Sequence, residues 1–316
     1  PGISSAASDV YKRQIDNLPI ISFPHYEGNS FVKEGFQWHD FINKFDPQKD
    51  NYYPLRNDIW TIIFTSGTTG DSKGAVIKYE SLDNTSEVHE SYNPLGIDMN
   101  GKNRMISYLP LNHIFERICV EWTCLMYGGN ISFVESIDTF GKNLQDVEPT
   151  TFAGVPRIYR KFQEKILEKI PQKWLNLLLK IPIISKLLKT KFKKTLGFSK
   201  VRTIASGAAA MPQSLLDWFK SIDIYIHNGY GMTENCCVCT NLDPYQDFGR
   251  GSVGKISSKS VKLKITDKGE ICMTGPFLLD SYYKNEKMTN ETLVNGWLHT
   301  GDKGYIGNCL LYTSPS

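Results

Sequence analysis

Glycine, hydroxyl and lysine side chains are concentrated in residues 65–74, whose sequence is TSGTTGDSKG. This stretch follows an apolar run over residues 59–64 that is rich in β-branched and aromatic residues, which predicts a strand. Glycines let the backbone turn so that N–H groups converge, and the hydroxyls and the Lys73 ammonium add further donors. The pattern indicates an anion-binding loop for polyphosphate, although its composition is also compatible with a plain surface connection.

The order of residues in this loop excludes one common type of phosphate-binding site. A Walker loop requires G-x-x-x-x-G-K-[ST], whereas Lys73 follows Ser72 and precedes Gly74. We therefore do not expect a nucleoside triphosphatase of the Walker type.

Two further motifs and one apolar segment carry residues that could do chemistry. The first motif is YGMTE at residues 230–234, and the second is GWLHTGD at residues 296–302. Taken alone, Thr233-Glu234 is also compatible with a helix N-cap followed by an acid in the first turn. Likewise, residues 300–302 are compatible with a common turn, and His113 in the segment LPLNHIFER, residues 109–117, with a capping or core histidine.

Together these motifs resemble the signatures of the adenylate-forming enzymes, the superfamily of acyl-CoA synthetases, luciferases and peptide-synthetase adenylation domains. The resemblance covers about residues 15–308, and residues 109–117 are most similar to the long-chain fatty acyl-CoA synthetases. It implies ATP-dependent activation of a fatty acid to an acyl-adenylate and transfer to CoA, with ATP, Mg²⁺ and CoA as cofactors or substrates. The alternatives left open are a ligase for an aryl or medium-chain acid, a luciferase-like enzyme, and a catalytically inactive nucleotide- or lipid-binding module.

The resemblance also implies a role for individual residues. Lys73 and its loop would hold the β- and γ-phosphates, Thr233 would reach the α-phosphate, and Glu234 would ligate Mg²⁺. Tyr230 would stack on adenine, and Asp302 would accept hydrogen bonds from the ribose hydroxyls. The expected catalytic residues are Lys73, Thr233, Glu234 and His113, the last near the acyl pocket and the thiol entrance. The expected nucleotide-binding residues are Thr65, Ser66, Gly67, Thr68, Thr69, Gly70, Lys73, Gly207, Ala208, Ala209, Tyr230, Gly231, Thr233 and Asp302.

Apolar runs alternate with helical patterns along most of the chain, which predicts an α/β fold with mostly parallel, doubly wound sheet layers and helices on both faces. Besides residues 59–64, strands are expected at 75–77, 104–109, 131–134, 151–155, 201–205 and 222–226, and helices at 82–92 and 113–127. Short alternating strands around the turn at residues 267–269 predict a small antiparallel β subdomain.

We expect an α/β core over residues 15–245 and the β subdomain over 246–308. Residues 1–14 and 309–316 lack periodicity and are expected to be non-native tails. The resemblance implies that a C-terminal lid domain with a catalytic lysine is missing, so this fragment is expected to be poorly active or inactive.

Composition limits the remaining possibilities. The 316 residues are 41% hydrophobic and 22% charged, which is typical of a globular protein, and nothing indicates a secretory signal or an apolar run of membrane-spanning length. A cytoplasmic location without a nucleic-acid partner is therefore expected. The seven cysteines are interpreted as reduced thiols, because Cys236, Cys237 and Cys239 lack a second Cys or His pair at zinc-ligand spacing.

Residues 160–200 are strongly basic. They contain twelve Lys or Arg and two Glu, although the net charge of the whole chain is only +3. Apolar residues interleave with the lysines, while Pro171 and Pro182 divide the segment into short helices. Two interpretations remain open: a solvated helical excursion, or an amphipathic element that makes a peripheral contact with anionic membrane.

Overall fold

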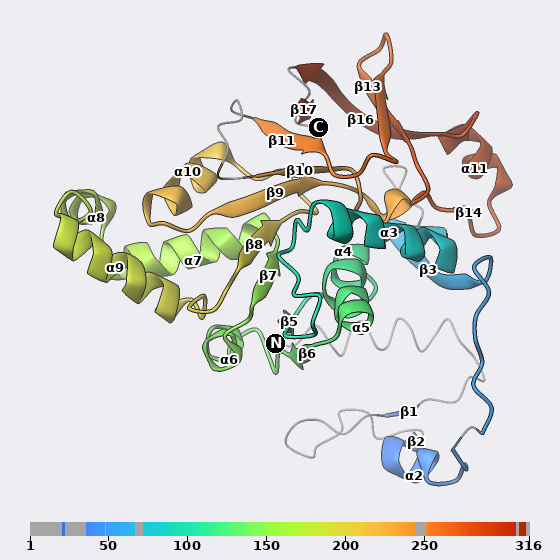
Figure 1. The fold of residues 1–316 in the computed structure, drawn as a ribbon, viewed down its shortest axis with the longest axis horizontal. Helices are drawn as coiled ribbons and strands as arrows, with labels where there is room; N and C mark the ends of the chain where they lie inside the picture. Colours follow the sequence, from blue (N-terminus) through green and yellow to red (C-terminus); the bar gives the residue numbers. More distant parts are fainter. Residues whose placement is uncertain are drawn as a thin grey trace. The chain divides into compact units, whose positions relative to one another are not determined.

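The computed structural model describes residues 21–22, 36–47, 49–66, 72–243, 245, 251–307 and 310–313. The chain divides into two compact units, Pro1–Tyr53 and Pro54–Ser316. In the first unit, β1 (Ile21–Ser22) pairs in parallel with β2 (Phe36–Gln37), and helix α2 (Trp38–Ile42) follows. All elements described below belong to the second unit (Figure 1).

The second unit begins with a β-hairpin whose two strands flank the predicted anion-binding loop. β3 (Ile59–Ser66) pairs antiparallel with β4 (Ser72–Lys78), and the register places Thr65 opposite Lys73. β14 (Ser281–Tyr282) adds a third strand by pairing antiparallel with β4. The strand predicted from residue 59 is confirmed, whereas the short strand predicted at 75–77 belongs to a longer one that begins at Ser72.

Two groups of parallel strands follow. β5 (Arg104–Ser107) pairs with β6 (Asn130–Phe133), and β8 (Thr203–Ser206) lies between β7 (Thr151–Gly154) and β9 (Ile226–Tyr230). The helices of this part are α3 (Tyr79–Ser91), α4 (Ile114–Glu116), a π-helical segment η1 (Arg117–Trp122), α5 (Thr123–Tyr127), α6 (Phe140–Val147), α7 (Pro156–Lys169), α8 (Gln172–Leu178), α9 (Pro182–Thr195) and α10 (Gln213–Ser221).

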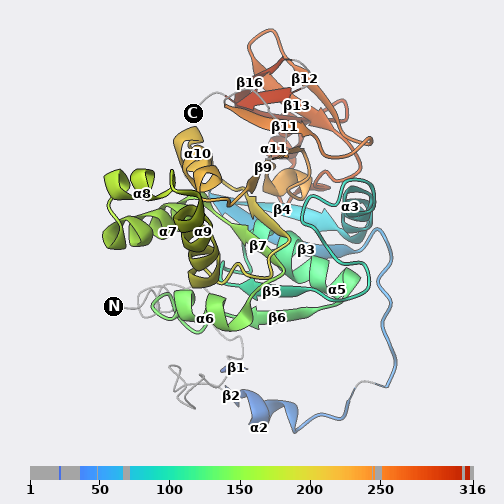
Figure 2. The same cartoon turned by 60° about the vertical axis from the view of Figure 1, so that its left-hand side comes forward.

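Helices cover both faces of the β7–β8–β9 layer because successive residues of each strand point to opposite sides. Phe152 and Ile204 belong to a core shared with α7 and α10, whereas their neighbours Ala153 and Ala205 belong to a core shared with Phe115 and the η1 segment. Figure 2 shows α7–α10 on one side of β7 and β9, and α3 and α5 on the other. The α/β class with helices on both faces is thus confirmed.

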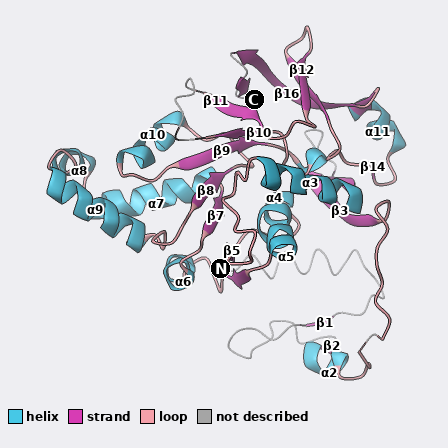
Figure 3. Ribbon diagram, in the orientation of Figure 1, coloured by secondary structure: helices cyan, strands magenta, loops and turns pink. Residues whose placement is uncertain are grey.

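The remaining strands are antiparallel. They are β10 (Thr240–Leu242), β11 (Ser252–Ile256), β12 (Lys262–Ile265), β13 (Glu270–Thr274), β15 (Leu293–Val294), β16 (Trp297–Gly307) and β17 (Leu310–Thr313). They extend the sheet from β9 in the order β9-β10-β11-β17-β16-β13-β12. A 3₁₀ turn, η2 (Thr233–Asn235), connects β9 to β10, and α11 (Glu286–Thr292) precedes β15. Figure 3 shows this strand-rich part beside the helical one.

Three details differ from the sequence predictions. Antiparallel pairing takes a larger share than expected: among the described strands only β1–β2, β5–β6 and β7–β8–β9 are parallel. The strand predicted at 222–226 was wrong in position. Ile222 caps α10 and Asp223 has a positive φ of 67°, so the strand begins only at Ile226. Within the predicted tail at 309–316, residues 310–313 form β17 with Leu310 and Leu311 buried, and its non-native origin stays a prediction; residues 1–14 lie outside the described ranges.

Candidate active site

A buried ionic cluster joins three segments that are far apart in sequence. The Nζ atom of Lys73 on β4 lies 3.1 Å from Oε1 of Glu234 in η2 and 3.0 Å from the hydroxyl oxygen of Tyr282 on β14. The Tyr282 hydroxyl donates a hydrogen bond of 2.6 Å to the same Glu234 oxygen. Lys73, Glu234 and Tyr282 therefore form a closed triangle of contacts.

Backbone pairing holds this cluster in place. The β14–β4 register sets Tyr282 opposite Ala75, and the Tyr283 N–H donates to the Gly74 carbonyl oxygen at 2.7 Å. The Leu279 N–H donates to the Glu234 carbonyl oxygen at 2.8 Å, which connects η2 to the segment before β14. The side chains thus meet on a rigid scaffold rather than on a free loop.

Burial makes the contacts of Glu234 important. Glu234 is only 3% exposed, and a buried carboxylate is costly unless a cation and hydrogen-bond donors compensate it. Burial and the neighbouring Glu234 raise the pKa of Tyr282 well above its usual value, so its hydroxyl remains a neutral donor. Lys73 is then the charged partner of Glu234.

A largely apolar cavity reaches Cys236, two residues after Glu234 in the chain. Its lining includes Gly207 and Ala208 after β8, Tyr230 and Gly231 at the end of β9, and Phe115. A Cβ added to Gly207 would lie 3.1 Å from a Phe115 ring carbon, and one added to Gly231 would lie 2.6 Å from the Cys237 carbonyl. Both glycines therefore allow close approach of neighbouring groups at the cavity wall.

Tyr230 connects the cavity to the C-terminal motif. Its hydroxyl donates a hydrogen bond of 2.7 Å to Oδ2 of Asp302 on β16. Burial, and then the Asp302 carboxylate, raise the pKa of Tyr230 far above its usual value. Tyr230 also packs in the same hydrophobic cluster as Ala75 and Tyr282, so the β4, β9 and β16 motifs converge in one region.

Known proteins resemble this chain in sequence and in fold. A family model described as AMP-binding enzyme matches residues 12–283. The chain belongs to the AMP-binding enzyme family. The family resemblance drawn from the three motifs is therefore confirmed.

Two relatives of this AMP-binding enzyme act as reference points. It is 31% identical over 329 residues to long chain acyl-CoA synthetase 3 of Arabidopsis thaliana and 32% identical over 282 residues to long-chain-fatty-acid–CoA ligase 5 of Rattus norvegicus. These alignments cover 90% and 79% of the chain but 49% and 41% of the relatives. The chain thus spans about half the length of the curated relatives it matches or less.

Solved structures give the same fold. The o-succinylbenzoate CoA synthetase of Bacillus subtilis, in complex with an acyl-adenylate intermediate, is 25% identical with a TM-score of 0.67, covering 88% of this chain and 53% of that one. The N-terminal domain of FACL13 from Mycobacterium tuberculosis also has a TM-score of 0.67, covers 90% of this chain and 68% of that one, and at 21% identity is similar in fold alone.

Some of the predicted site residues lie outside the part of the chain that the structure describes. Gly67, Thr68, Thr69 and Gly70 lie outside the described residues, as does the side chain of Ser66. Thr65, opposite Lys73, has a buried hydroxyl without a hydrogen-bond partner among the described residues.

Other predicted residues lie around or outside the cavity. Thr233 is the first residue of η2, whose N-cap is Met232, so Thr233 is not the capping residue that the simpler interpretation supposed. Ala209 and His113 are exposed and do not line the cavity, and the His113 imidazole accepts a hydrogen bond from the Phe115 N–H at 3.2 Å. His113 therefore caps α4, which was the simpler interpretation of this residue.

Tyr282 and Phe115 were not predicted to be site residues, although Tyr282 contacts Glu234 and Phe115 lines the cavity. Tyr282 lies in the segment LLDSYY, residues 278–283, which contains no pattern of charged or metal-binding residues. Its role depends on the pairing of β14 with β4. This pairing brings Tyr282 to Lys73, which lies 209 residues earlier in the chain. Phe115 was part of the predicted helix, but only the fold shows that its ring lies against Gly207.

Among the residues described, no helix combines the length and apolar character needed to cross a bilayer.

Proposed function

We propose that this chain is part of an ATP-dependent acid–CoA ligase that activates a long-chain fatty acid as its acyl-adenylate and transfers it to CoA. The observation that carries the proposal is the Lys73–Glu234–Tyr282 cluster, because Tyr282 packs in one hydrophobic cluster with Tyr230, which lines the cavity. The names of the relatives, long chain acyl-CoA synthetase and long-chain-fatty-acid–CoA ligase, support the choice of acid.

The β3–β4 hairpin is assigned the phosphates. Lys73 supplies a cation, and the unpartnered Thr65 hydroxyl opposite it supplies a donor that burial leaves unsatisfied. Such charge neutralisation and alignment is what phosphoryl-group chemistry requires of a protein. In this assignment Lys73 exchanges its contact with Glu234 for phosphate oxygens.

Glu234 fits the role of a Mg²⁺ ligand. Mg²⁺ is usually bound through one or two carboxylates together with substrate phosphates. Glu234 is a buried carboxylate whose Oε1 atom already contacts a cation, the ammonium group of Lys73. Mg²⁺ would neutralise phosphate charge there, while Tyr282 keeps the carboxylate oriented through its 2.6 Å hydrogen bond.

The nucleoside is assigned to the end of β9 and to β16. Gly207, which has no side chain, and Ala208, which has only a methyl group, leave room in the cavity for a flat ring, and Tyr230 presents a ring held by Asp302. Asp302 uses Oδ2 for Tyr230, and a carboxylate can accept further hydrogen bonds from ribose hydroxyls.

The acyl chain is assigned to the apolar side of the cavity, where Val88, Leu95, Phe115, Ile118 and Cys119 form the wall. The cavity volume is about 90 Å³, whereas ligand pockets usually measure about 300–1,000 Å³. A long chain therefore enters only if side chains move, and Phe115, whose ring lies against Gly207, is the residue we expect to rotate.

The first test is calorimetric titration of the chain with AMP and with ATP plus Mg²⁺. Asp302→Asn should weaken AMP binding about tenfold or more, because a charge-assisted hydrogen bond contributes about 1.5–3 kcal/mol. Asp267→Asn, an exposed acid in the β12–β13 turn, is the matched control and should leave affinity unchanged. Absence of AMP and ATP binding, or equal affinity for Asp302→Asn and wild type, would contradict the proposal.

The choice of acid is tested separately, on the chain within its full-length natural protein. Pyrophosphate release is measured with long-chain, medium-chain and aryl acids. Preference for the long-chain acid supports the proposal, preference for another class corrects the substrate, and nucleotide binding without release indicates an inactive module.

We further propose that α8 and α9 make a peripheral contact with anionic membrane. Trp174 on α8 is 61% exposed and Ile183 on α9 is 76% exposed, and Leu177 and Leu187 are exposed beside them in sequence. By helical spacing, Ile183, Leu187 and Lys194 share one face of α9, flanked by Lys186 and Lys191. An exposed apolar face bordered by lysines suits the boundary between lipid headgroups and acyl chains.

Co-sedimentation with vesicles of phosphatidylcholine containing phosphatidylserine tests this contact. Changing Lys186, Lys191 and Lys194 together to Glu should lower binding about 100-fold, because each lysine near such a surface contributes about 1 kcal/mol. The control changes three exposed lysines of the antiparallel part, Lys259, Lys262 and Lys268, to Glu. Equal binding by wild type and both variants would reject the membrane contact.

A further inference from the structure

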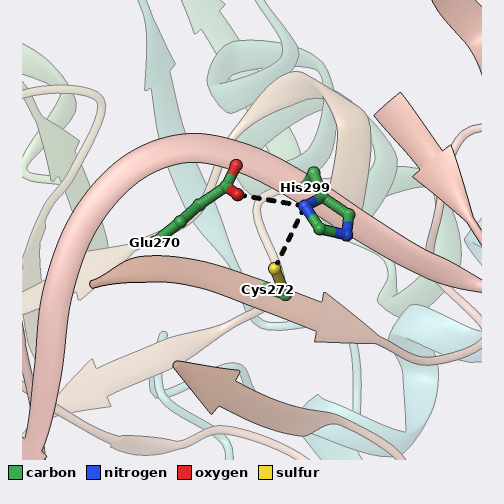
Figure 4. Close-up of side chains that lie close together, drawn as sticks. All are labelled: Glu270, Cys272 and His299. Carbon is green, nitrogen blue, oxygen red and sulfur yellow. Dashed lines mark hydrogen bonds and ion pairs between the residues drawn. The ribbon is translucent and has the colours of Figure 1, made fainter. Parts of the chain in front are cut away.

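A second cluster of metal-ligating side chains lies in the antiparallel part, outside the site described above. Glu270 and Cys272 are on β13, and His299 is on the neighbouring β16. The His299 Nδ1 atom lies 3.0 Å from Oε2 of Glu270 and 3.5 Å from Sγ of Cys272. Figure 4 shows both the carboxylate and the thiol directed at this one ring nitrogen.

The strand register explains why the three donors meet. Residues two apart on a strand point to the same face, and Cys272 is the direct cross-strand partner of His299. A register shift between Glu270 and Cys272 places Glu270 opposite Lys303 instead, and its carboxylate reaches back to His299. The three donors are thus positioned by a sheet, the kind of rigid support that a metal site requires.

We propose that Glu270, Cys272 and His299 form a binding site for a divalent transition-metal ion of the zinc type. Carboxylate, thiolate and imidazole are the ligands that Zn²⁺ takes in proteins. The three donor atoms lie within 4.8 Å of one another. Among the described residues, this is the group of three or more His, Cys, Asp or Glu whose donor atoms are close enough to share a metal ion.

The two donor separations that involve His299 Nδ1 are close to those of tetrahedral coordination. Typical zinc–ligand distances predict separations of about 3.6 Å between sulfur and nitrogen and about 3.4 Å between nitrogen and oxygen. The observed values are 3.5 Å and 3.0 Å, so small adjustments of the Glu270 side chain would complete the geometry. Three protein ligands leave the fourth position for water or another ligand.

The surroundings support the first ligands and leave a path for the ion. The second oxygen of Glu270, Oε1, accepts a hydrogen bond from the Gly301 N–H at 3.0 Å, which orients the carboxylate. The side chains of His299 and Glu270 are 29% and 28% exposed, so the ion can enter from solvent, while Cys272 is fully buried at the base.

Metal binding must displace the thiol proton. Burial, and then the adjacent Glu270, raise the pKa of Cys272, so its sulfur is protonated before an ion arrives. When the metal–sulfur bond forms, the S–H bond breaks and the proton leaves to buffer, without any change of oxidation state. The Nδ1 atom of His299 must also offer its lone pair to the metal, so the proton that it shares with Glu270 moves to Nε2 of the same ring by exchange with solvent. Affinity should therefore increase with pH.

The ordinary alternative is a hydrogen-bonded His–Glu pair with a bystander thiol. The test uses the reduced, metal-free chain, titrated with Co²⁺ as a spectroscopic probe and with Zn²⁺ by calorimetry. We expect one ion per chain, with a thiolate-to-cobalt charge-transfer band and the visible bands of tetrahedral cobalt.

Variants separate the two explanations. Cys272→Ser should abolish the charge-transfer band and lower Zn²⁺ affinity about 100-fold, and Glu270→Gln should lower it about tenfold while retaining the band. Cys124→Ser, a buried cysteine outside the cluster, is the matched control and should behave as wild type. A wild-type spectrum without tetrahedral cobalt, or a band that persists in Cys272→Ser, would overturn the proposal. Because the wild-type spectrum needs no substitution, a poorly folded variant does not spoil the test.

Discussion

The Lys73–Glu234–Tyr282 cluster and the Glu270–Cys272–His299 cluster each bring a carboxylate to two other polar groups, but they are built differently. Lys73 and Tyr282 are 209 residues apart, whereas Cys272 and His299 are 27 apart and lie on neighbouring strands. Glu234 is buried with a charged partner, while Glu270 is partly open to solvent. The first cluster depends on the whole fold, and the second depends on one strand pairing.

This difference indicates where stability and where ligand exchange should be found. A buried ion pair becomes very unfavourable when one partner is removed, because the remaining charge has neither water nor a counterion. A partly exposed pair can replace its partner with water or an ion at little cost. The first cluster should therefore respond strongly to substitution, and the second should mainly change what it binds.

The largest effect is expected for Lys73→Met. This change removes the cation beside the buried Glu234 carboxylate and leaves the Tyr282 hydrogen bond, so the free energy of unfolding should fall by about 3–4 kcal/mol. Urea denaturation measures it. Lys78→Met is the matched control on the same strand, where Lys78 pairs with the more exposed Asp280, and should cost about 1 kcal/mol or less. Equal losses for the two variants would remove the distinction between buried and exposed pairs.

Much of the first cluster could be predicted from sequence because its charged members lie in motifs. Lys73 follows a Gly/Ser/Thr-rich loop, and Glu234 follows the end of a strand, so both were placed at one site. The confirmed α/β class followed in the same way from alternating apolar and helical patterns. Tyr282 could not be found, since an uncharged residue in an apolar segment gives no signal until β14 is seen to pair with β4.

The second cluster could not be predicted at all, because it depends on register. Sequence reasoning looked for cysteines close together, and so considered residues 236–239 and interpreted Cys272 as a core thiol. Cys272 is indeed buried, but its cross-strand partner is a histidine, a fact that no spacing in the sequence contains. The strand predicted at 222–226 was misplaced for a similar reason. Asp223 has a left-handed backbone directly after the end of α10, and the apolar pattern of residues 222–226 does not reveal it.

A pH experiment extends the comparison to two histidines. His89 lines the cavity, and its buried Nδ1 atom has no hydrogen-bond partner among the residues that the structure describes. Burial lowers the pKa of His89 from 6.5 to about 4, whereas His299 has Glu270 beside it. His89 binds a proton more tightly in the unfolded chain than in the folded one. Its contribution to stability is therefore fully present above the unfolded-state pKa of 6.5 and is lost as the pH falls toward the folded-state pKa of about 4. Between about pH 7 and pH 5 this loss should be about 2 kcal/mol.

Urea denaturation at the two pH values measures the loss. His89→Leu should reduce the acid-dependent loss by about 2 kcal/mol, because it removes the group that titrates. His299→Gln serves as the comparison and should leave most of the loss in place. An unchanged pH dependence in His89→Leu would show that other groups cause it.

The smallest expected difference concerns single hydrogen bonds in the two clusters. Tyr282→Phe removes the 2.6 Å hydrogen bond to the buried Glu234 but leaves Lys73 as its counterion, so the free energy of unfolding should fall by about 1–2 kcal/mol. Glu270→Gln keeps a side-chain oxygen for the Gly301 N–H and loses only a partly exposed charge, so it should cost about 0.5 kcal/mol. Combining Tyr282→Phe with Lys73→Met should give less than the sum of the single losses if the three side chains act as one unit, whereas Glu270→Gln, in the other cluster, should add independently to either. Strict additivity within the first cluster would mean that its contacts are separate pairs, and would remove the reason to treat it as the centre of the site.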